Sequence, residues 1–445
     1  MSKIARGSVS KLRWYVVAAA TTAVLVVAAL AGPALRDALL TDGSPEPGPT
    51  PSTGPGNCPV SQKLVPECGS WWGVAPGVFT TTPASTALAD FESKTGRHAD
   101  IYHRYHRGDE LFPTRDEIAA AHDPAGPRVL LVNWKVAWGT TWADVAAGGQ
   151  DERIDRLAEH LKQTFGDKFF LSLHHEPEND VDPDPDSGMT AKDYAAMYRH
   201  TVERLRDDGV DNAVFVMIYM GFQRWATQPW FDRLYPGDDV VDWIGYDPYV
   251  SADPTADHHG DFARLVNQTS DPDTWPGFYN WSVAHHPDKP LMLSEWGVFE
   301  YPDDPARKAE IFDSVEQQLP DYPALKALVY FDSPRAPRGD TRIDSSDDAL
   351  DAFRTLAALP IFSVLWGPTD PNPSPSPTGS APASATPTVS PATSASASPN
   401  PSGSTPSSPS PTASPVVTSP VPSRPPSPSP SGTASQSASP VHRRS

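Results

Sequence analysis

Apolar runs and amphipathic stretches alternate along the middle of this chain. Several of the runs are apolar without interruption, which is typical of parallel β-strands that are covered on both faces. Eight β-rich runs are predicted as strands, at residues 71–79, 99–106, 128–135, 168–176, 212–220, 240–249, 290–297 and 325–332. Together with the stretches between them, they predict an α/β fold.

Helical spacing is clearest in residues 151–165 and 190–208, where apolar residues recur three and four positions apart. Thr190 is a suitable N-cap with Asp193 three residues on, and Gly209 is a natural C-terminal stop. Eight strand and helix units in roughly 300 residues predict a (β/α)8 TIM barrel. The alternative, a doubly wound open sheet, lacks support because no glycine-rich phosphate loop follows the first run.

Both ends of the chain differ in composition from its middle. Residues 1–13 are basic and residues 14–31 are an uncharged apolar run, which predicts either a cleaved signal peptide or a retained signal anchor. We therefore expect an extracellular or cell-surface protein that meets the membrane only through this segment. Residues 32–57 form a Pro/Gly-rich linker and residues 367–445 a Pro/Ser/Thr-rich tail that we expect to be disordered, which leaves 58–366 as the folded domain.

The predicted domain is strongly acidic. Eight of the chain's 35 Lys and Arg residues and four of its 55 Asp and Glu residues lie outside 58–366, so the domain has a net charge of −24. This charge argues against a polyanionic partner such as nucleic acid, and a neutral substrate suits it better. We expect no cofactor and a monomeric protein.

Cys58 and Cys68 are the two cysteines of the chain. In an exported protein, two cysteines ten positions apart predict one short disulfide that pins the start of the domain. A catalytic or metal-binding thiol pair is the alternative interpretation.

The carboxyl ends of the strands are where a (β/α)8 barrel places its active site. The run 168–176 should end at Glu176, because Pro177 lacks an N–H and biases the preceding residue towards extended backbone. The run 290–297 brings Glu295 to the same mouth, and Gly297 should stop it. A glycoside hydrolase requires at least one such pair of carboxyl groups, one to act as an acid and one as a base or nucleophile. In retaining enzymes the two carboxyl groups lie about 5 to 5.5 Å apart.

Aromatic side chains also gather at the predicted strand ends and in the loops that follow them. They are Trp134, Trp138, Trp142, Trp225, Trp230, Trp275 and Trp296. Sugars can stack on such rings, but a barrel tryptophan is more often core, so we expect only about half of them to contact a ligand. On the run 99–106 and just beyond it, His103, Arg104 and Arg107 also approach the mouth, where salt bridging is the simpler role for Arg107.

The ordered segments HHEPEN (174–179), YPGDDVVDWIGYDPY (235–249), KPLMLSEWG (289–297) and VYFD (329–332) resemble glycoside hydrolase family 26, as does GGQDERIDRLAEHLK (148–162). This family belongs to a clan of retaining (β/α)8 enzymes and includes endo-β-1,4-mannanases, mixed-linkage β-glucanases and some xylanases. The resemblance covers most of residues 70–335. It implies a hydrolase that acts on a β-linked polysaccharide.

The resemblance also implies a role for particular residues. Glu176 would be the general acid/base, directly after the family's histidine, here His175, and Glu295 would be the nucleophile. Tyr249 matches the tyrosine that hydrogen-bonds the nucleophile in this clan. One departure concerns the third strand, where mannanases of the family tend to have Trp followed by His, whereas Trp134 is followed here by Lys135. This difference puts mannan in doubt without changing the reaction type. Lys135, like His103 and His175, is expected to contact the substrate.

Three other interpretations compete with this one. A metal hydrolase is disfavoured because HHEPE lacks the second histidine of an HExxH helix. Asp182, Asp184 and Asp186 have the opening spacing of a calcium loop, although a solvated acidic loop is the simpler interpretation. A non-catalytic carbohydrate-binding or cell-wall scaffold protein is the alternative function, and its simplest mark, loss of a carboxylate, is absent. Glu178 is expected to be a loop carboxylate.

Overall fold

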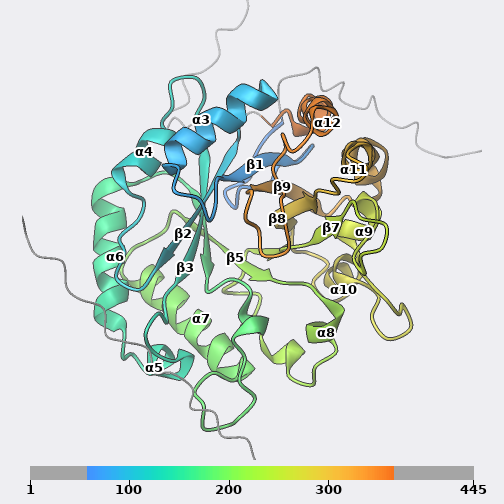
Figure 1. Ribbon diagram of the computed structural model, residues 1–445. Coiled ribbons are helices and arrows are strands. Elements are labelled where there is room, and N and C mark those ends of the chain that lie inside the picture. The colour runs from blue at the N-terminus through green and yellow to red at the C-terminus, as the bar shows by residue number, and fades with distance from the viewer. Residues whose placement is uncertain (1–57, 365–445) are drawn as a thin grey trace, which may run out of the picture. The chain divides into compact units, whose positions relative to one another are not determined.

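Parallel strand pairing runs from strand to strand around a closed circle. The computed structural model describes residues 58–364, and in this part of the chain β1 pairs with β2 and so on to β6, β6 pairs with β8, β8 with β9, and β9 again with β1 (Figure 1). The short strand β7 pairs with the carboxyl half of β8, outside the circle. The predicted (β/α)8 barrel is confirmed.

The strands lie close to the predicted positions. They are β1 (Trp71–Pro76), β2 (Ile101–Arg107), β3 (Val129–Lys135), β4 (Phe169–Leu173), β5 (Ala213–Tyr219), β6 (Trp243–Tyr246), β7 (Tyr249–Ser251), β8 (Leu291–Phe299) and β9 (Leu325–Asp332). The run 240–249 is divided between β6 and β7. Gly297 does not stop β8, which continues to Phe299, so that prediction was wrong.

Helices surround the barrel (Figure 1). They are α3 (Ala84–Thr95), α4 (Arg115–Ala121), α5 (Trp142–Ala146), α6 (Asp151–Thr164), α7 (Ala191–Asp207), α8 (Gln223–Ala226), α9 (Phe262–Val266), α10 (Phe278–His285), α11 (Ala306–Gln318) and α12 (Asp347–Ala357). The predicted capping box of α7 is present, because the Thr190 side chain accepts from the backbone N–H of Asp193 while the Asp193 side chain accepts from that of Thr190. Both predicted amphipathic helices, α6 and α7, are confirmed.

The apolar side chains form an inner and an outer layer. The inner layer fills the barrel and includes Ile101, Leu131, Phe170 and Val216. A larger outer layer lies between strands and helices. Because each strand contributes alternate residues to the two layers, its sequence is apolar throughout, as predicted for parallel strands covered on both faces.

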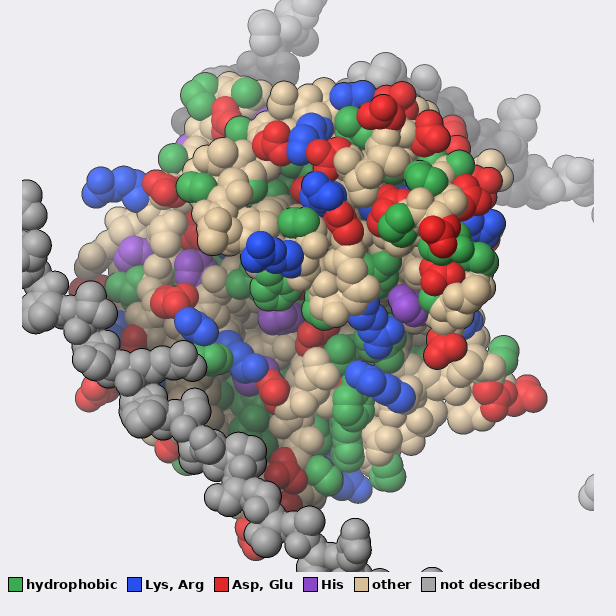
Figure 2. Space-filling view, in the orientation of Figure 1, with side chains coloured by type: hydrophobic (Ala, Val, Ile, Leu, Met, Phe, Trp, Pro, Cys, Tyr) green, Lys and Arg blue, Asp and Glu red, His purple; other side chains and the backbone are tan. Residues whose placement is uncertain are grey.

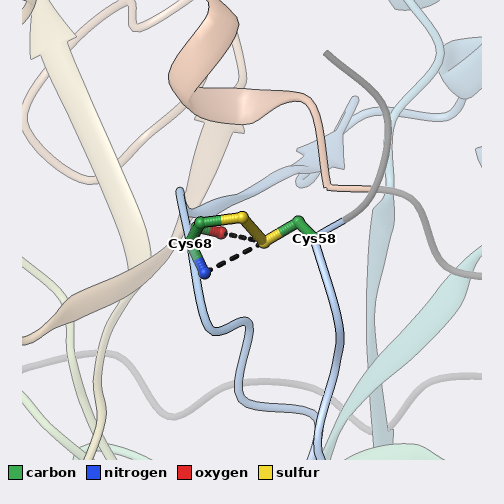
Figure 3. The surroundings of a disulfide bond; sticks show 2 residues. All are labelled: Cys58 and Cys68. Atoms are coloured by element: carbon green, nitrogen blue, oxygen red, sulfur yellow. Dashed lines mark hydrogen bonds between the residues drawn. A yellow bond between two sulfur atoms is a disulfide. The ribbon is translucent and has the colours of Figure 1, made fainter. Parts of the chain in front are cut away.

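The segment before β1 packs against the amino-terminal end of the barrel. The indole N–H of Trp71 donates to the carbonyl of Leu64 at 2.8 Å, and that of Trp243 donates to the carbonyl of Lys63 at 2.6 Å. A disulfide joins Cys58 to Cys68, with Cα atoms 5.5 Å apart (Figure 3). The predicted disulfide is therefore confirmed.

The predicted signal segment, the linker and the tail lie outside the described residues. Within residues 58–364 no helix is long and apolar enough to cross a membrane.

Candidate active site

The residues after β4 leave the strand conformation earlier than predicted. β4 ends at Leu173, and both His174 (φ 56°) and Glu176 (φ 53°) adopt the left-handed region. The prediction that Glu176 would be an extended strand residue was wrong. Backbone hydrogen bonds hold this turn to both neighbouring strands, from the N–H of His174 to the carbonyl of Trp134 and from the N–H of Glu176 to the carbonyl of Ile218. The conformation costs energy in a non-glycine residue, and these contacts stabilise it.

The left-handed turn decides which histidine reaches the barrel mouth. Continued alternation from Phe170 and Ser172 would place His174 inside, but its ring packs outward against Trp142 at a centroid distance of 5.1 Å. His175 instead lies inside, with its ring 5.7 Å from that of Tyr105. Burial and the nearby His174 lower the pKa of His175 to about 3, so this ring is neutral.

Asp180 fixes the turn from outside the barrel. It accepts a 2.7 Å hydrogen bond from Nε2 of His174 and another of 2.7 Å from Nζ of Lys135. These hydrogen bonds hold the pKa of Asp180 below its usual range. Lys135, which was predicted to bind substrate, is therefore a structural partner of this carboxylate.

Glu295 projects into the mouth because β8 is irregular at this point. Leu293 pairs with Leu328 and Trp296 with Tyr330, so Ser294 and Glu295 share a bulge opposite one residue of β9. Regular alternation would have placed Glu295 with Leu291 and Leu293, which belong to the outer layer. The bulge turns Glu295 inward and leaves Trp296 outside, as bulges near active sites commonly do.

Two tyrosines donate hydrogen bonds to Glu295. Tyr105 donates to Oε1 at 2.7 Å and Tyr249 donates to Oε2 at 2.8 Å. Burial and the charge of Glu295 raise the pKa of both tyrosines well above the usual value, so both remain donors. The hydrogen bond predicted between Tyr249 and Glu295 is present. Gly297 makes it possible, because a Cβ there would meet the Tyr249 ring at 2.9 Å.

Asp247 is a third carboxyl group beside the pair. It is fully buried, and Oδ1 accepts a 2.7 Å hydrogen bond from Ser294, while Oδ2 has no partner among the described residues. Burial, and then the charges of Glu295 and Glu176, raise its pKa well above the usual value. Asp247 is thus held neutral, which limits the negative charge that the mouth must hold.

The two predicted catalytic carboxyl groups differ in surroundings. Burial, and then the charge of Glu295, raise the pKa of Glu176 to about 8. Burial raises the pKa of Glu295 to about 7, while the hydrogen bonds from Tyr105 and Tyr249 oppose the rise. Glu176 is therefore the group that keeps its proton, and Glu295 is the group that loses its proton first.

Glu178 is not merely the loop carboxylate that was predicted. It is 1% exposed, and its Oε1 accepts from the backbone N–H of Met220 at 2.9 Å and from that of Gly221 at 3.4 Å. Burial raises its pKa to about 7. Glu178 therefore fixes the start of the loop after β5, which leads into α8.

Glu176 opens onto a pocket of about 250 Å3. Asp247 and Tyr249 form part of its wall, and the remaining lining comes from Asn179, Met220, Phe222, Arg224, His258, Phe299, Pro337 and Arg338. We call this the active-site pocket. It combines apolar and aromatic surface with a few convergent polar groups, as binding sites for small polar ligands do.

Several predicted ligand contacts are contradicted by burial. Trp134 is fully buried and donates to the carbonyl of Gly108, and Trp296 is fully buried in the outer layer. Neither can stack on a sugar, so both predictions were wrong. His103 is also fully buried, with its ring stacked 4.4 Å from that of Tyr105, and it can act only through Tyr105.

Trp138 remains available to a ligand. Its side chain is 48% exposed, and the guanidinium of Arg107 lies 4.4 Å from its ring centroid. Arg107 also lies 3.7 Å from Glu110, in agreement with the simple ionic role expected for it. A sugar contact of Trp138 stays a prediction.

Tyr105 and Asp247 were missed by the sequence analysis. Tyr105 lies two positions after His103 on β2, so the period of the strand placed it on the same face and nearer the mouth. Asp247 lies two positions before Tyr249 in the segment already singled out. Both signals were therefore present in the sequence.

Among the residues that the structure describes, one group of side chains is close enough to share a metal ion. Ligand atoms of His175, Asp247 and Glu295 lie within 4.8 Å of one another. Both oxygens of Glu295 already accept tyrosine hydrogen bonds, so the donor set fits an organised carboxylate better than a metal ligand. In the acidic loop, Asp182 and Asp184 each accept the backbone N–H two residues on, which accounts for their spacing without an ion.

Comparison with known proteins agrees with the family resemblance that the sequence motifs carry. The profile of glycosyl hydrolase family 26 matches residues 184–271, a stretch that contains Asp247 and Tyr249. This match confirms the resemblance that the sequence motifs indicated. A β-1,3-xylanase from a Vibrio species is 23% identical over 267 residues, which are 58% of this chain and 52% of the xylanase. The chain thus spans about half the length of that curated relative.

Solved structures of mannanases are also similar. A ruminal family 26 endo-β-1,4-mannanase aligns with 17% identity and a TM-score of 0.46, over 65% of this chain and 63% of the mannanase. A double mutant of the Cellulomonas fimi endo-β-1,4-mannanase aligns with 20% identity and a TM-score of 0.45, over 66% of this chain and 71% of the other.

Proposed function

We propose that this relative of glycosyl hydrolase family 26 is an exported, retaining glycoside hydrolase that cleaves a β-linked polysaccharide. The observation that carries the proposal is the pair of tyrosine hydrogen bonds on Glu295, together with a Glu176 whose pKa is raised to about 8 by burial and by the charge of Glu295. The tyrosines orient Glu295 and favour its ionised form, and Glu176 is the group that keeps its proton to higher pH. A double displacement requires these two states at its start.

In the first step, Glu295 attacks the anomeric carbon of the sugar and Glu176 donates its proton to the departing glycosidic oxygen. The bond from the anomeric carbon to that oxygen breaks as the bond to a Glu295 oxygen forms, and the result is a glycosyl-enzyme. The two tyrosines restrict rotation of the attacking carboxylate. His175 is neutral and adds no positive charge that would lower the pKa of Glu176.

In the second step, Glu176 accepts a proton from water, and the water oxygen attacks the anomeric carbon. Once Glu295 is esterified, its charge no longer raises the pKa of Glu176, so Glu176 can act as a base. Glu295 then leaves with its negative charge restored. Two inversions give a product with the configuration of the substrate.

The candidate substrates are β-mannan, mixed-linkage β-glucan and xylan. The similar proteins are named as β-1,3-xylanase and endo-β-1,4-mannanases, which supports a β-linked backbone without selecting one. Because Lys135 is paired with Asp180, it does not argue for or against mannan.

The proposal is tested by incubating the full-length protein with soluble mannan, mixed-linkage glucan, β-1,4-xylan and β-1,3-xylan. We expect reducing ends to be released from at least one, and proton NMR of the first product to show the β-anomer. Binding to one polymer without release of reducing ends from any would instead identify a carbohydrate-binding scaffold. Release of the α-anomer first would contradict the retaining mechanism.

A further inference from the structure

Arginine side chains line one side of the active-site pocket although the domain as a whole is strongly acidic. Arg224, on α8, and Arg338, in the loop after β9, both contribute to its wall. Figure 2 shows Lys and Arg side chains where Figure 1 places α8, whereas Asp and Glu side chains gather over α11 and α12. The positive charge is therefore local and lies beside the catalytic carboxylates.

These two arginines are held by aromatic rings. The guanidinium of Arg224 lies 4.8 Å from the ring centroid of Trp225, and that of Arg338 lies 5.8 Å from the centroid of Phe222. No carboxylate lies within 4.0 Å of either guanidinium in the part of the chain that the structure describes. A planar guanidinium stacked on a ring keeps its N–H groups available at its edge for a bidentate acceptor.

The positively charged wall continues beyond the active-site pocket. A second pocket of about 260 Å3 shares Phe222, Arg224, His258 and Arg338 with the first, and adds Arg264 and Asp257. We call the two together the arginine groove. In its outer part the lining holds three arginines and one acidic residue, Asp257, and one of the three, Arg264, donates to the backbone carbonyl of Thr269.

The positive charge of Arg338 affects a histidine that lines the same groove. The pKa of His258 is lowered by burial and then by the charge of Arg338, against the opposing charges of Asp257 and Asp253. His258 is therefore neutral at neutral pH, and the net positive charge of the outer groove comes from arginine alone.

A neutral polysaccharide has no negative charge to pair with these arginines. Sugar hydroxyls can accept from arginine, but a carboxylate or sulfate adds the attraction between opposite charges and presents two oxygens that match the guanidinium edge. An anionic substituent would otherwise be repelled by the ionised Glu295, so it must meet positive charge to one side of the catalytic pair. Arg224 and Arg338 supply positive charge at that place.

We propose that the arginine groove binds a sugar unit that carries an anionic substituent, next to the glycosidic bond that is cleaved. This inference rests on the proposed function and names the substrate class more narrowly. It replaces the neutral substrate suggested by the overall charge, because the net charge of −24 describes the whole domain and not this groove.

The binding test uses each neutral polymer of the panel together with its carboxymethylated and its sulfated form, at matched length. Binding is measured on the full chain in a Glu176→Gln background, which prevents turnover and preserves the shape of the side chain. The variant is the double substitution Arg224→Gln and Arg338→Gln. The control is Arg115→Gln, which removes one positive charge at an exposed position of α4, where the arginine also lacks an ion pair among the described residues.

For at least one backbone, we expect a charged form to bind about tenfold more tightly than its parent, and the double variant to lose that advantage, so that it binds the charged and the parent form about equally. The advantage should shrink as salt rises, and Arg115→Gln should keep it. A carboxymethyl preference identifies a carboxylate, and a sulfate preference identifies a sulfate ester. Equal binding of charged and neutral forms, or an unchanged advantage in the double variant, would overturn the inference.

Activity separates this inference from the proposed function. If the protein with Glu176 intact hydrolyses no polymer but the arginines still select charged forms, the hydrolase proposal fails and the groove assignment stands. If it hydrolyses neutral polymers but binds charged forms no more tightly than neutral ones with both arginines in place, the groove assignment fails and the hydrolase stands.

Discussion

Tyr105 and Glu295 are 190 residues apart in the sequence, and their side chains meet in a 2.7 Å hydrogen bond at the mouth of the barrel. Tyr249 approaches the other oxygen of the same carboxylate. The two donors come from β2 and β7, and the acceptor comes from the bulge in β8. Three separate segments thus organise one carboxylate, which is the arrangement expected of a group that must attack from a fixed direction.

The pH dependence of kcat/KM should follow the states of the two glutamates. Activity rises as Glu295 loses its proton, near its pKa of about 7, and falls as Glu176 loses its own, near its pKa of about 8. We therefore expect a narrow bell with its maximum between these values. Initial rates on the best polymer of the panel measure it, and a plateau that extends to pH 4 would contradict the assignment.

Tyr105→Phe should move the acidic limb of that bell to higher pH. The variant removes a donor that favours the ionised form of Glu295, so the pKa of Glu295 rises and a smaller fraction is ionised below neutral pH. A hydrogen bond to a charged group contributes about 1.5 to 3 kcal/mol, which predicts a shift of about one pH unit or more. Tyr249→Phe is the matched variant on the other oxygen. A loss of activity that is uniform at all pH values would indicate a merely structural tyrosine.

Replacing Glu178 by Gln should leave the protein stable, whereas replacing it by Ala should destabilise it. Gln retains an oxygen that can accept the N–H groups of Met220 and Gly221, and it suits a buried site that raises the pKa of the carboxyl group. Glu178→Ala leaves these donors without a partner and should cost about 1 to 3 kcal/mol of unfolding free energy. Chemical denaturation measures the difference. Equal destabilisation by both variants would show that the charge itself is required.

A chelator should leave activity unchanged. Although His175, Asp247 and Glu295 are close enough to share an ion, the hydrogen bonds on Glu295 already organise it as a carboxylate. Rates before and after dialysis against EDTA measure this, with re-addition of Zn2+ and Ca2+ as the control. Loss of activity on chelation that is restored by one metal would show that the cluster is a metal site.

The sequence predicted the barrel and the strand positions well because periodicity and turn residues are local signals. It could not predict which way the side chains face at the mouth. His174 and Glu176 adopt left-handed backbone after the strand ends, and Glu295 faces inward because of a bulge. Neither feature produces a periodic pattern in the sequence, so periodicity could not reveal it. The two catalytic candidates were therefore found from Pro177 and the family motifs, although the expected extended geometry at Glu176 was wrong.

The tryptophans show a second limit of sequence reasoning. Trp134 and Trp296 looked like sugar platforms because they lie near strand ends, yet both are buried. In a barrel whose strands are covered on both faces, an aromatic residue is apolar in the sequence whether it faces the core, the helices or the ligand. Only the fold separates Trp138, which is exposed, from the other two.

The nucleophile assignment is tested most directly by chemical rescue of Glu295→Ala. The small side chain removes the attacking oxygen and leaves space beside the anomeric carbon, where azide can enter from the same face. The account predicts that Glu295→Ala has no measurable turnover, and that azide restores it and yields a glycosyl azide of inverted configuration. Undiminished activity of Glu295→Ala without azide would contradict it.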